Sequence, residues 1–356
     1  MPRSLNIDII KGLGICLVVL GHCGCPITHF IYLFHVPIFF IASGYVLSCA
    51  YSDNLSGLLT LTRKRLKGLW LPCFFFNTAF LLLTSLFVNL NIQTGGGSIS
   101  AIAKGVALNA VFLGNGGPMA GACWFLSTLF EITVGYAIVG YVLKRSCVKR
   151  REYINLLIGL ILFVVSFYLI KHNLRSNVAE HFMGAYVMLC LGAVLRSRHS
   201  RLASFNTKRW SVIFIVTLVI LLALNRYGSI EVGKGIYTSP WFYIVCALSG
   251  WFFMYSISFF MTKVSWLSKT FCYLGKNTVC IIGLHFLAFK IVSLVQISVY
   301  GLPQEKLSTF PYLIAEPFWW VAYTVVGICV PLLLNELWNR GKNCISANKK
   351  MKEVHV

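Results

Sequence analysis

Ionisable side chains within apolar stretches are the residues of this sequence whose chemistry matters first. A charged group inside a lipid bilayer is costly, so ionisable residues at membrane depth are functional candidates. An uncharged imidazole can take a proton from a hydroxyl group, which makes the histidines among them candidate general bases. The candidates are Asp8, Lys11, His22, His35, Glu131, His285 and Lys290.

Lys11 and His22 are spaced so that one helix presents both side chains on the same face. His22 follows Lys11 by eleven residues, which corresponds to about three helical turns and about 16 Å along the helix axis. Asp8 precedes Lys11 by three residues, a spacing that allows an ion pair on a helix. We therefore predict a helix face with a cation near one membrane surface and an imidazole near the other.

The remaining candidates fall where they can share a site with His22. His35 lies near the start of the second apolar stretch, at a depth comparable to that of His22, because the chain turns back between them. Glu131 falls two turns after Trp124, which begins a later stretch at the outer face, and His285 lies near the middle of another. Each has a structural alternative: the histidines as hydrogen-bonded bridges between helices, and Glu131 as an interhelical clamp.

The elements that must position these residues are membrane-spanning helices. Hydrophobic residues make up 58% of the chain and charged residues 12%, whereas about 25% of residues are charged in an ordinary soluble domain. The apolar runs are continuous rather than alternating, so they predict an all-α polytopic fold and not a barrel. About ten runs are long enough to span a bilayer, at roughly 9–22, 30–50, 69–90, 121–143, 153–171, 181–196, 211–228, 238–261, 278–298 and 311–335.

The formal net charge of +21 indicates membrane topology rather than nucleic-acid binding, because the basic residues are concentrated in alternate loops. One set of segments holds 24 of the 31 basic residues: Arg3, Lys11, Arg63, Lys64, Arg65, Lys67, Lys144, Arg145, Lys149, Arg150, Arg151, Arg196, Arg198, Arg201, Lys208, Arg209, Lys263, Lys269, Lys276, Arg340, Lys342, Lys349, Lys350 and Lys352. The opposite set holds Lys104, Lys171, Arg175, Arg226, Lys234 and Lys306. The positive-inside rule predicts that the first set and both termini are cytoplasmic.

The chain shows no internal repeat and no soluble domain. We expect a single transmembrane domain over residues 1–340 and a basic cytoplasmic tail over residues 341–356 that rests on anionic lipid headgroups. Residues 91–120 form the longest non-apolar stretch on the outer face, and we expect either a flexible connector or a loop that covers a site. The stretch from Gly12 to Gly21 has the length of a signal-peptide core, but Asp8 before it favours a retained helix.

The sequence motifs of several enzyme classes are missing. There is no His-Glu-x-x-His zinc motif, no Gly-x-Ser-x-Gly elbow and no phosphate-binding or dinucleotide-binding loop. We therefore expect no metal ion. The residues alone indicate a membrane-embedded polar site with a histidine base, a description that a transporter also satisfies.

Two sequence blocks resemble the acyltransferase 3 family of integral membrane O-acyltransferases, and within it the fucose 4-O-acetylase-like branch. The blocks are Asn6-Ile7-Asp8-Ile9-Ile10-Lys11-Gly12-Leu13-Gly14-Ile15 through Leu20-Gly21-His22, and Phe34-His35-Val36-Pro37-Ile38-Phe39-Phe40 with Ser43-Gly44. Weaker matches follow in the expected order, at Arg65-Leu66-Lys67 with Leu71-Pro72, Cys123-Trp124-Phe125-Leu126, and Leu274-Gly275-Lys276-Asn277-Thr278 with His285. Lys11 stands where arginine is common in the family, and lysine keeps the charge but loses the bidentate geometry.

The resemblance implies an enzyme of the cell inner membrane that transfers acetyl from cytoplasmic acetyl-CoA to a sugar hydroxyl of a cell-surface or lipid-linked polysaccharide. It implies His22 as the general base, with His35 and Glu131 as further catalytic candidates. Lys11, Arg65 and Lys67 are the expected contacts of the coenzyme A phosphates, although Arg65 and Lys67 also fit a purely topological role. Asp8, Trp124 and His285 are further site candidates.

Two functions of other classes remain as alternatives. A transporter or flippase of a glycan or lipid would keep its uptake or export activity without acetyl-CoA. A scaffold subunit of a polysaccharide assembly complex would be insensitive to His22→Ala in every activity assay.

Overall fold

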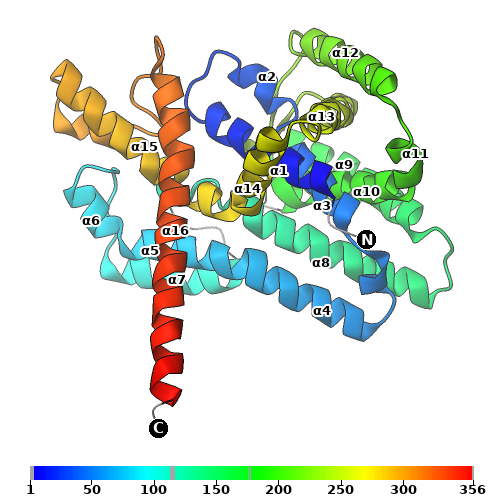
Figure 1. Ribbon diagram of the computed structural model, residues 1–356, viewed down its shortest axis with the longest axis horizontal. Helices are drawn as coiled ribbons and strands as arrows, with labels where there is room; N and C mark the ends of the chain where they lie inside the picture. The colour runs from blue at the N-terminus through cyan, green and yellow to red at the C-terminus, as the bar shows by residue number, and fades with distance from the viewer. Residues whose placement is uncertain (1–3, 113–116, 175, 177, 355–356) are drawn as a thin grey trace.

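The computed structural model describes residues 4–112, 117–174, 176 and 178–354, and helices dominate these ranges (Figure 1). Within them, seven helical segments are long and apolar enough to cross a membrane. They are Thr28–Val46, Trp124–Arg145, Arg151–Lys171, Thr207–Leu224, Pro240–Met261, Thr278–Tyr300 and Trp319–Asn343. The prediction of an all-α polytopic fold is confirmed.

The elements follow one another along the chain with short connections. The α-helices are α1 (Leu5–Gly21), α2 (Thr28–Tyr32), α3 (Pro37–Val46), α4 (Leu55–Arg65), α5 (Leu71–Leu82), α6 (Thr84–Asn89), α7 (Ile99–Phe112), α8 (Trp124–Arg145), α9 (Arg151–Lys171), α10 (Met183–Ser197), α11 (His199–Ala203), α12 (Thr207–Leu224), α13 (Pro240–Met261), α14 (Ser265–Lys276), α15 (Thr278–Tyr300) and α16 (Trp319–Val354). Tighter or wider helical turns are η1 (Cys49–Ser52), η2 (Leu66–Trp70), η3 (Pro118–Ala120), η4 (Val178–Phe182), η5 (Val232–Lys234) and η6 (Gln304–Ser308).

Four of the ten predicted spans correspond to shorter or broken helices, and one of them is the second span, which is interrupted before Pro37. Helix α1 has 17 residues, α5 and α6 are separated at Leu83, and α10 has 15 residues preceded by the π-helical turn η4. The number of ten spans and the cytoplasmic location of the termini stay predictions. The basic tail begins within α16, which extends away from the other helices at its C-terminal end (Figure 1).

Residues 91–120 form more regular structure than a connector requires. Helix α7 occupies Ile99–Phe112 and packs against α5. Lys104 is the only charged residue in α7, and Gly105 and Asn109 are buried positions of this helix. Gly114, Asn115 and Gly116, which mark the predicted loop, lie outside the described residues.

Helix α1 lies within the bundle and packs against α3, α13, α14, α15 and α16 (Figure 1). Glycine makes the closest of these contacts possible. A Cβ atom on Gly12 would overlap the Phe271 carbonyl of α14, and one on Gly275 would overlap the Asp8 carbonyl of α1. Small residues let helix backbones approach closely in a membrane, so these two glycines hold α1 firmly in place.

The second predicted span is interrupted at its proline. Helix α2 ends at Tyr32 and α3 begins at Pro37. Proline has no backbone N–H, so the carbonyl of Leu33 loses its helical partner there. This break leaves His35 in the turn between the two helices.

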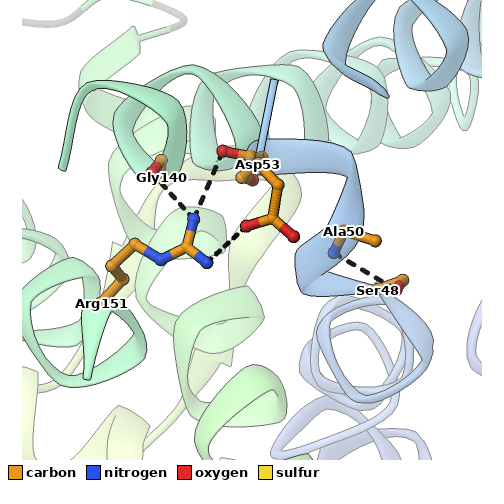
Figure 2. A network of polar contacts seen from close by, with 6 residues as sticks. Ser48, Ala50, Asp53, Gly140 and Arg151 are labelled. Atoms are coloured by element: carbon orange, nitrogen blue, oxygen red, sulfur yellow. Dashed lines mark hydrogen bonds and ion pairs between the residues drawn. The ribbon is translucent and has the colours of Figure 1, made fainter. Parts of the chain in front are cut away.

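A polar network fixes the connection between α3 and α4 (Figure 2). The guanidinium of Arg151 donates to the carbonyls of Ser52 (3.3 Å) and Gly140 (3.4 Å) and forms an ion pair with Asp53 (2.7 Å). One side chain of α9 thereby ties the end of η1 to α8. The network holds the start of α4, whose last turn carries the basic residues Arg63, Lys64 and Arg65 of the predicted cytoplasmic side.

Candidate active site

Two imidazoles meet at the end of α1. His22 follows directly after α1, and its Nδ1 lies 3.0 Å from Nε2 of His285 on α15. The two rings are nearly parallel, with an interplanar angle of 11°. Phe286 covers both rings, with its centroid 4.9 Å from that of His22 and 4.1 Å from that of His285. The predicted grouping of His22 and His285 is therefore present.

The hydrogen bonds of His285 determine which nitrogens of this pair carry protons. Its Nδ1 lies 3.0 Å from the carbonyl oxygens of Ile281 and of Ile282. A carbonyl only accepts, so Nδ1 of His285 is the donor and Nε2 of the neutral ring is an acceptor. His22 must then donate from its own Nδ1, which leaves a lone pair on Nε2 of His22. That nitrogen has no hydrogen-bond partner among the described residues.

A cavity of about 780 Å³, which we name the outer cavity, opens beside His22. Its lining residues come from segments on the predicted outer side of the membrane, which agrees with the alternation of the loops. Aromatic rings contribute much of the wall, and an ion pair between Lys234 and Glu231 (2.9 Å) stands at one side. The lining residues include His22, Tyr32, His35, Trp124, Glu231, Lys234, Phe286, Phe310 and Tyr312.

A short hairpin and a stacked pair of rings shape the rim of the outer cavity. Strands β1 (Ile230–Glu231) and β2 (Ile236–Tyr237) pair antiparallel around η5. Trp124 stacks on His181 at 4.6 Å, and Nε2 of His181 donates to the carbonyl of Gly233 at 3.2 Å. These contacts join the start of α8 to the hairpin and hold Trp124 against the cavity.

A buried lysine positions another wall of the outer cavity. Lys290 of α15 is 3% exposed, and its ammonium donates to the carbonyls of Leu307 and Thr309, both at 2.8 Å. Further along α15, the side chain of Gln296 exchanges two hydrogen bonds with the backbone of Ile314. Both anchors hold the loop 302–318, which supplies Phe310 and Tyr312 to the cavity.

The same loop presses on the turn that follows His22. Gly24 has a φ of 72°, and a Cβ atom there would lie 2.6 Å from the side chains of Ala315 and Tyr312. Only glycine combines this left-handed conformation with so close an approach. The turn after α1 and the loop 302–318 therefore form one packed surface around the histidine pair.

His35 reaches the same cavity from the break between α2 and α3. Its side chain is 2% exposed, and its Nδ1 lies 3.0 Å from the carbonyl of Ile31. The carbonyl makes Nδ1 the donor, so Nε2 of neutral His35 is also an acceptor. His22 and His35 both border a second, small void of about 40 Å³ just below the outer cavity.

A third cavity, which we name the inner cavity, lies at the other end of α1. Its volume is about 710 Å³, and its lining residues all belong to segments of the predicted cytoplasmic side. Asp8 and Lys11 enter it from α1, and Arg196 enters from α10. The phenol of Tyr45 and Nδ1 of His199, 2.6 Å apart, complete the polar lining.

Helix α1 runs between the two cavities, with Lys11 at the inner cavity and His22 at the outer cavity. The helix is continuous from Leu5 to Gly21 and His22 follows it directly, so Lys11 and His22 lie about 16 Å apart along the axis. Between them, the ring of Phe39 lies against Gly14, where a Cβ atom would be 2.8 Å from the ring. Phe39 also borders the small void below His22. Its ring therefore joins the middle of α1 to the wall of the void.

Three of the predicted site residues lie elsewhere. The side chain of Glu131 is exposed on α8 and lines none of the three cavities. Lys67 borders a separate groove together with Lys276 and Trp338. Arg65, half-buried at the end of α4, is also absent from the inner-cavity lining. Among the predicted phosphate contacts, the structure brings Lys11 alone to the inner cavity.

Several residues of the two cavities carry no sequence signal of a role in a site. Arg196 is one of the basic residues that predict topology, and nothing in the sequence distinguishes it from its neighbour Arg198. Tyr45 and His199 lie 154 positions apart, so no local spacing relates them. Phe310 and Tyr312 reach the outer cavity through the loop that Lys290 anchors. The sequence offers one signal for that loop, which is that Lys290 lies within an apolar run and therefore needs a polar partner.

Comparison with known proteins supplies the family. Residues 4–336 match a family described as an acyltransferase domain. Searches of curated proteins and of solved structures find no match for the chain. The matched range contains the histidine pair, the inner cavity and the spans that carry them. The chain therefore belongs to the acyltransferase 3 family of membrane acyltransferases.

Proposed function

We propose that this acyltransferase moves an acetyl group from acetyl-CoA on the cytoplasmic side of the cell inner membrane to a hydroxyl of a cell-surface or lipid-linked saccharide. The carrying observation is the hydrogen-bond chain from the Ile281 and Ile282 carbonyls through His285 to His22. This chain orients a lone pair of His22 without consuming it, which is the requirement for a general base. The resemblance to the fucose 4-O-acetylase-like branch supports a sugar as the acceptor.

His22 carries the proton in each half of the reaction. Its Nε2 takes the proton of the acceptor hydroxyl while the hydroxyl oxygen attacks the thioester carbonyl carbon. The resulting imidazolium donates its Nδ1–H to His285, which stabilises the positive charge. When the carbon–sulfur bond breaks, the proton on Nε2 passes to the thiolate of coenzyme A. The products are the O-acetylated saccharide and the free thiol.

The inner cavity supports the donor end of this proposal. Lys11 and Arg196 offer two cations to the phosphates of coenzyme A, and Arg196 can bind an oxygen pair in bidentate geometry. The rim adds Lys64, whose ammonium donates to the phenol of Tyr51 at 2.8 Å. From this cavity the acetyl-bearing arm would extend along α1 toward His22, over the distance of about 16 Å that separates Lys11 from His22.

The outer cavity supports the acceptor end. Ligand sites combine apolar and aromatic walls with a few polar groups that orient the ligand. Here Trp124 and Tyr312 offer aromatic surfaces, while Glu231 and Lys234 offer an acceptor and donors to hydroxyl groups. The cavity has a volume of about 780 Å³, which lies in the range of sites for drug-sized ligands. A terminal sugar unit of a glycan is a ligand of this size and polarity.

The test is transfer of labelled acetate into saccharide, in a native strain that lacks the gene and expresses wild type or His22→Ala at matched levels. We expect the variant to lose about 10²–10⁴ of the transfer rate, the contribution of a positioned general base. His29→Ala is the matched control, because His29 is exposed, bonds to Asn225 and lines none of the three cavities.

Each outcome separates the hypotheses. Equal labelling in wild type and His22→Ala would contradict the role of His22 and favour a scaffold. Absence of label even in wild type, with export of a glycolipid intact, would favour a transporter or flippase.

A further inference from the structure

The small void between His22 and Phe39 has the position of a binding site for the group that is transferred. His22 and His35 form its polar side, toward the outer cavity. Its other walls are apolar and come from α1, α3, the start of α8 and α15. They are Val18, Val36, Phe39, Ala122, Trp124, Phe125 and Ile282. A group placed here touches the proposed base on one side and hydrocarbon on the others.

The size of the void sets what it can hold. Its volume is about 40 Å³, and a water-sized group needs about 10–15 Å³ of such space. The void therefore has room for a small group, and on its polar side it continues toward the outer cavity. An acetyl group has three non-hydrogen atoms: the methyl carbon, the carbonyl carbon and the carbonyl oxygen. A butyryl group has two more, which would press against the apolar walls.

The walls that limit this size are themselves held in place. Phe125 is 9% exposed, and its ring packs against Phe40 at 5.2 Å and against Phe39 at 5.3 Å. Ala122 is 6% exposed and precedes Phe125 by three residues. Packed interiors yield little to an added methylene, so these side chains determine the volume of the void.

We propose that this void is the acyl subsite of the enzyme and that Phe125 and Ala122 restrict the donor to a two-carbon acyl group. This inference rests on the proposed function, because it takes an acyl-CoA as the donor and His22 as the base. It adds the chain-length specificity and the residues that determine it. Phe125 and Ala122 act by shape alone, and His22 remains the group that moves the proton.

The experiment compares donors of increasing length. Membrane vesicles from the native strain, deleted for the gene and expressing each variant, receive radiolabelled acetyl-, propionyl- or butyryl-CoA, and label is measured in the saccharide fraction. The variants are Phe125→Ala, the milder Phe125→Leu and Ala122→Leu. Phe80→Ala is the matched control, because Phe80 is equally buried at 4% exposure and lies outside the void.

We expect wild type to use butyryl-CoA at least about 100-fold less efficiently than acetyl-CoA, since one methylene in a filled pocket changes kcat/KM by about 10–200-fold. Phe125→Ala and Phe125→Leu should reduce this preference by about 10-fold or more, whereas Phe80→Ala should leave the ratio unchanged. Ala122→Leu fills the void, so it should lose acetyl transfer by about 100-fold and still bind free coenzyme A with the Kd of wild type.

The results separate this inference from the function on which it rests. Wild type that uses butyryl-CoA as well as acetyl-CoA would overturn the acyl subsite and leave the transferase intact. An equal effect of Phe80→Ala and Phe125→Ala on the donor ratio would do the same. No label from any donor in wild type would overturn the proposed function and the subsite with it.

Discussion

The two cavities at the ends of α1 hold their polar groups in different ways. At the outer end, the two histidines that lie beside His22 are tied to backbone carbonyls: His285 to Ile281 and Ile282, and His35 to Ile31. At the inner end, Lys11 and Arg196 project from two helices on long side chains. The outer histidines have one orientation and one tautomer, whereas the inner cations stand at the ends of longer side chains with more rotatable bonds.

This difference matches the two tasks of an acyltransferase. Proton transfer requires a particular nitrogen at hydrogen-bond distance from a particular hydroxyl, so a misplacement of about 1 Å can cost about 100-fold in rate. Binding of phosphates requires mainly charge, and single exposed or half-exposed cations contribute about 0–1 kcal/mol each. Perturbations at the outer end should therefore have larger effects than similar ones at the inner end.

The largest effect in this comparison is expected from His285. In His285→Ala, Nδ1 of His22 loses its acceptor, the other tautomer becomes accessible, and the imidazolium loses its partner. We expect kcat to fall by about 100-fold, with the KM for acetyl-CoA unchanged. His285→Gln restores an acceptor oxygen and should recover at least about 10-fold of that loss. The measurement is steady-state transfer from labelled acetyl-CoA in membrane vesicles.

A purely packing role for His285 gives a different result. Both variants would then lose activity in proportion to their loss of thermal stability, and His285→Gln would be no more active than His285→Ala at equal stability. Measuring Tm for both variants in detergent separates the two explanations.

Part of the site around the histidine pair could be predicted from the sequence. Apolar run length predicted the helices, and the eleven-residue spacing predicted that Lys11 and His22 face the same way on α1. Depth along the helices predicted that His22 and His35 lie at a comparable height, and the family resemblance added His285 as a further site candidate. These are properties of single helices or of their order along the chain, which periodicity and membrane thickness determine.

The residues that the sequence could not assign depend on how helices rotate and where loops return. Glu131 was predicted from depth alone, and its side chain lies outside the cavities, because depth does not determine the direction in which a helix face points. Arg196 is indistinguishable from Arg198 in the sequence, and packing of α10 against α3 selects one of them for the inner cavity. Tyr312 depends on a loop that buried anchors hold in place.

An intermediate effect is expected from the anchor of that loop. Lys290→Met removes the ammonium that binds the carbonyls of Leu307 and Thr309. Each buried carbonyl left without a donor costs about 1–3 kcal/mol, so the loop 302–318 should detach from α15. We expect the KM for the saccharide acceptor to rise about 10-fold, the change that corresponds to about 1.4 kcal/mol. The KM for acetyl-CoA should stay unchanged.

Lys306→Met is the control for this variant, because Lys306 is an exposed lysine on the same loop. It should leave both KM values unchanged. A rise of the KM for acetyl-CoA in Lys290→Met would contradict the separation of the two cavities, since Lys290 would then act on the whole bundle.

The smallest effect is expected at the inner end. Arg196→Gln removes one of the cations of the inner cavity, and a half-buried cation contributes about 1 kcal/mol to a screened contact. We expect the KM for acetyl-CoA to rise about fivefold, with kcat unchanged, and the difference from wild type to shrink at high salt because mobile ions screen the phosphates. The control is Arg198→Gln, because Arg198 lies two residues further along, bonds to Tyr153 and lines none of the three cavities.

If the two variants raise the KM for acetyl-CoA equally, the donor is bound by the general basic charge of this face and not by the inner cavity. A drop in kcat for Arg196→Gln alone would instead mean that the inner end also needs a fixed geometry, and the contrast between the two ends of α1 would fail.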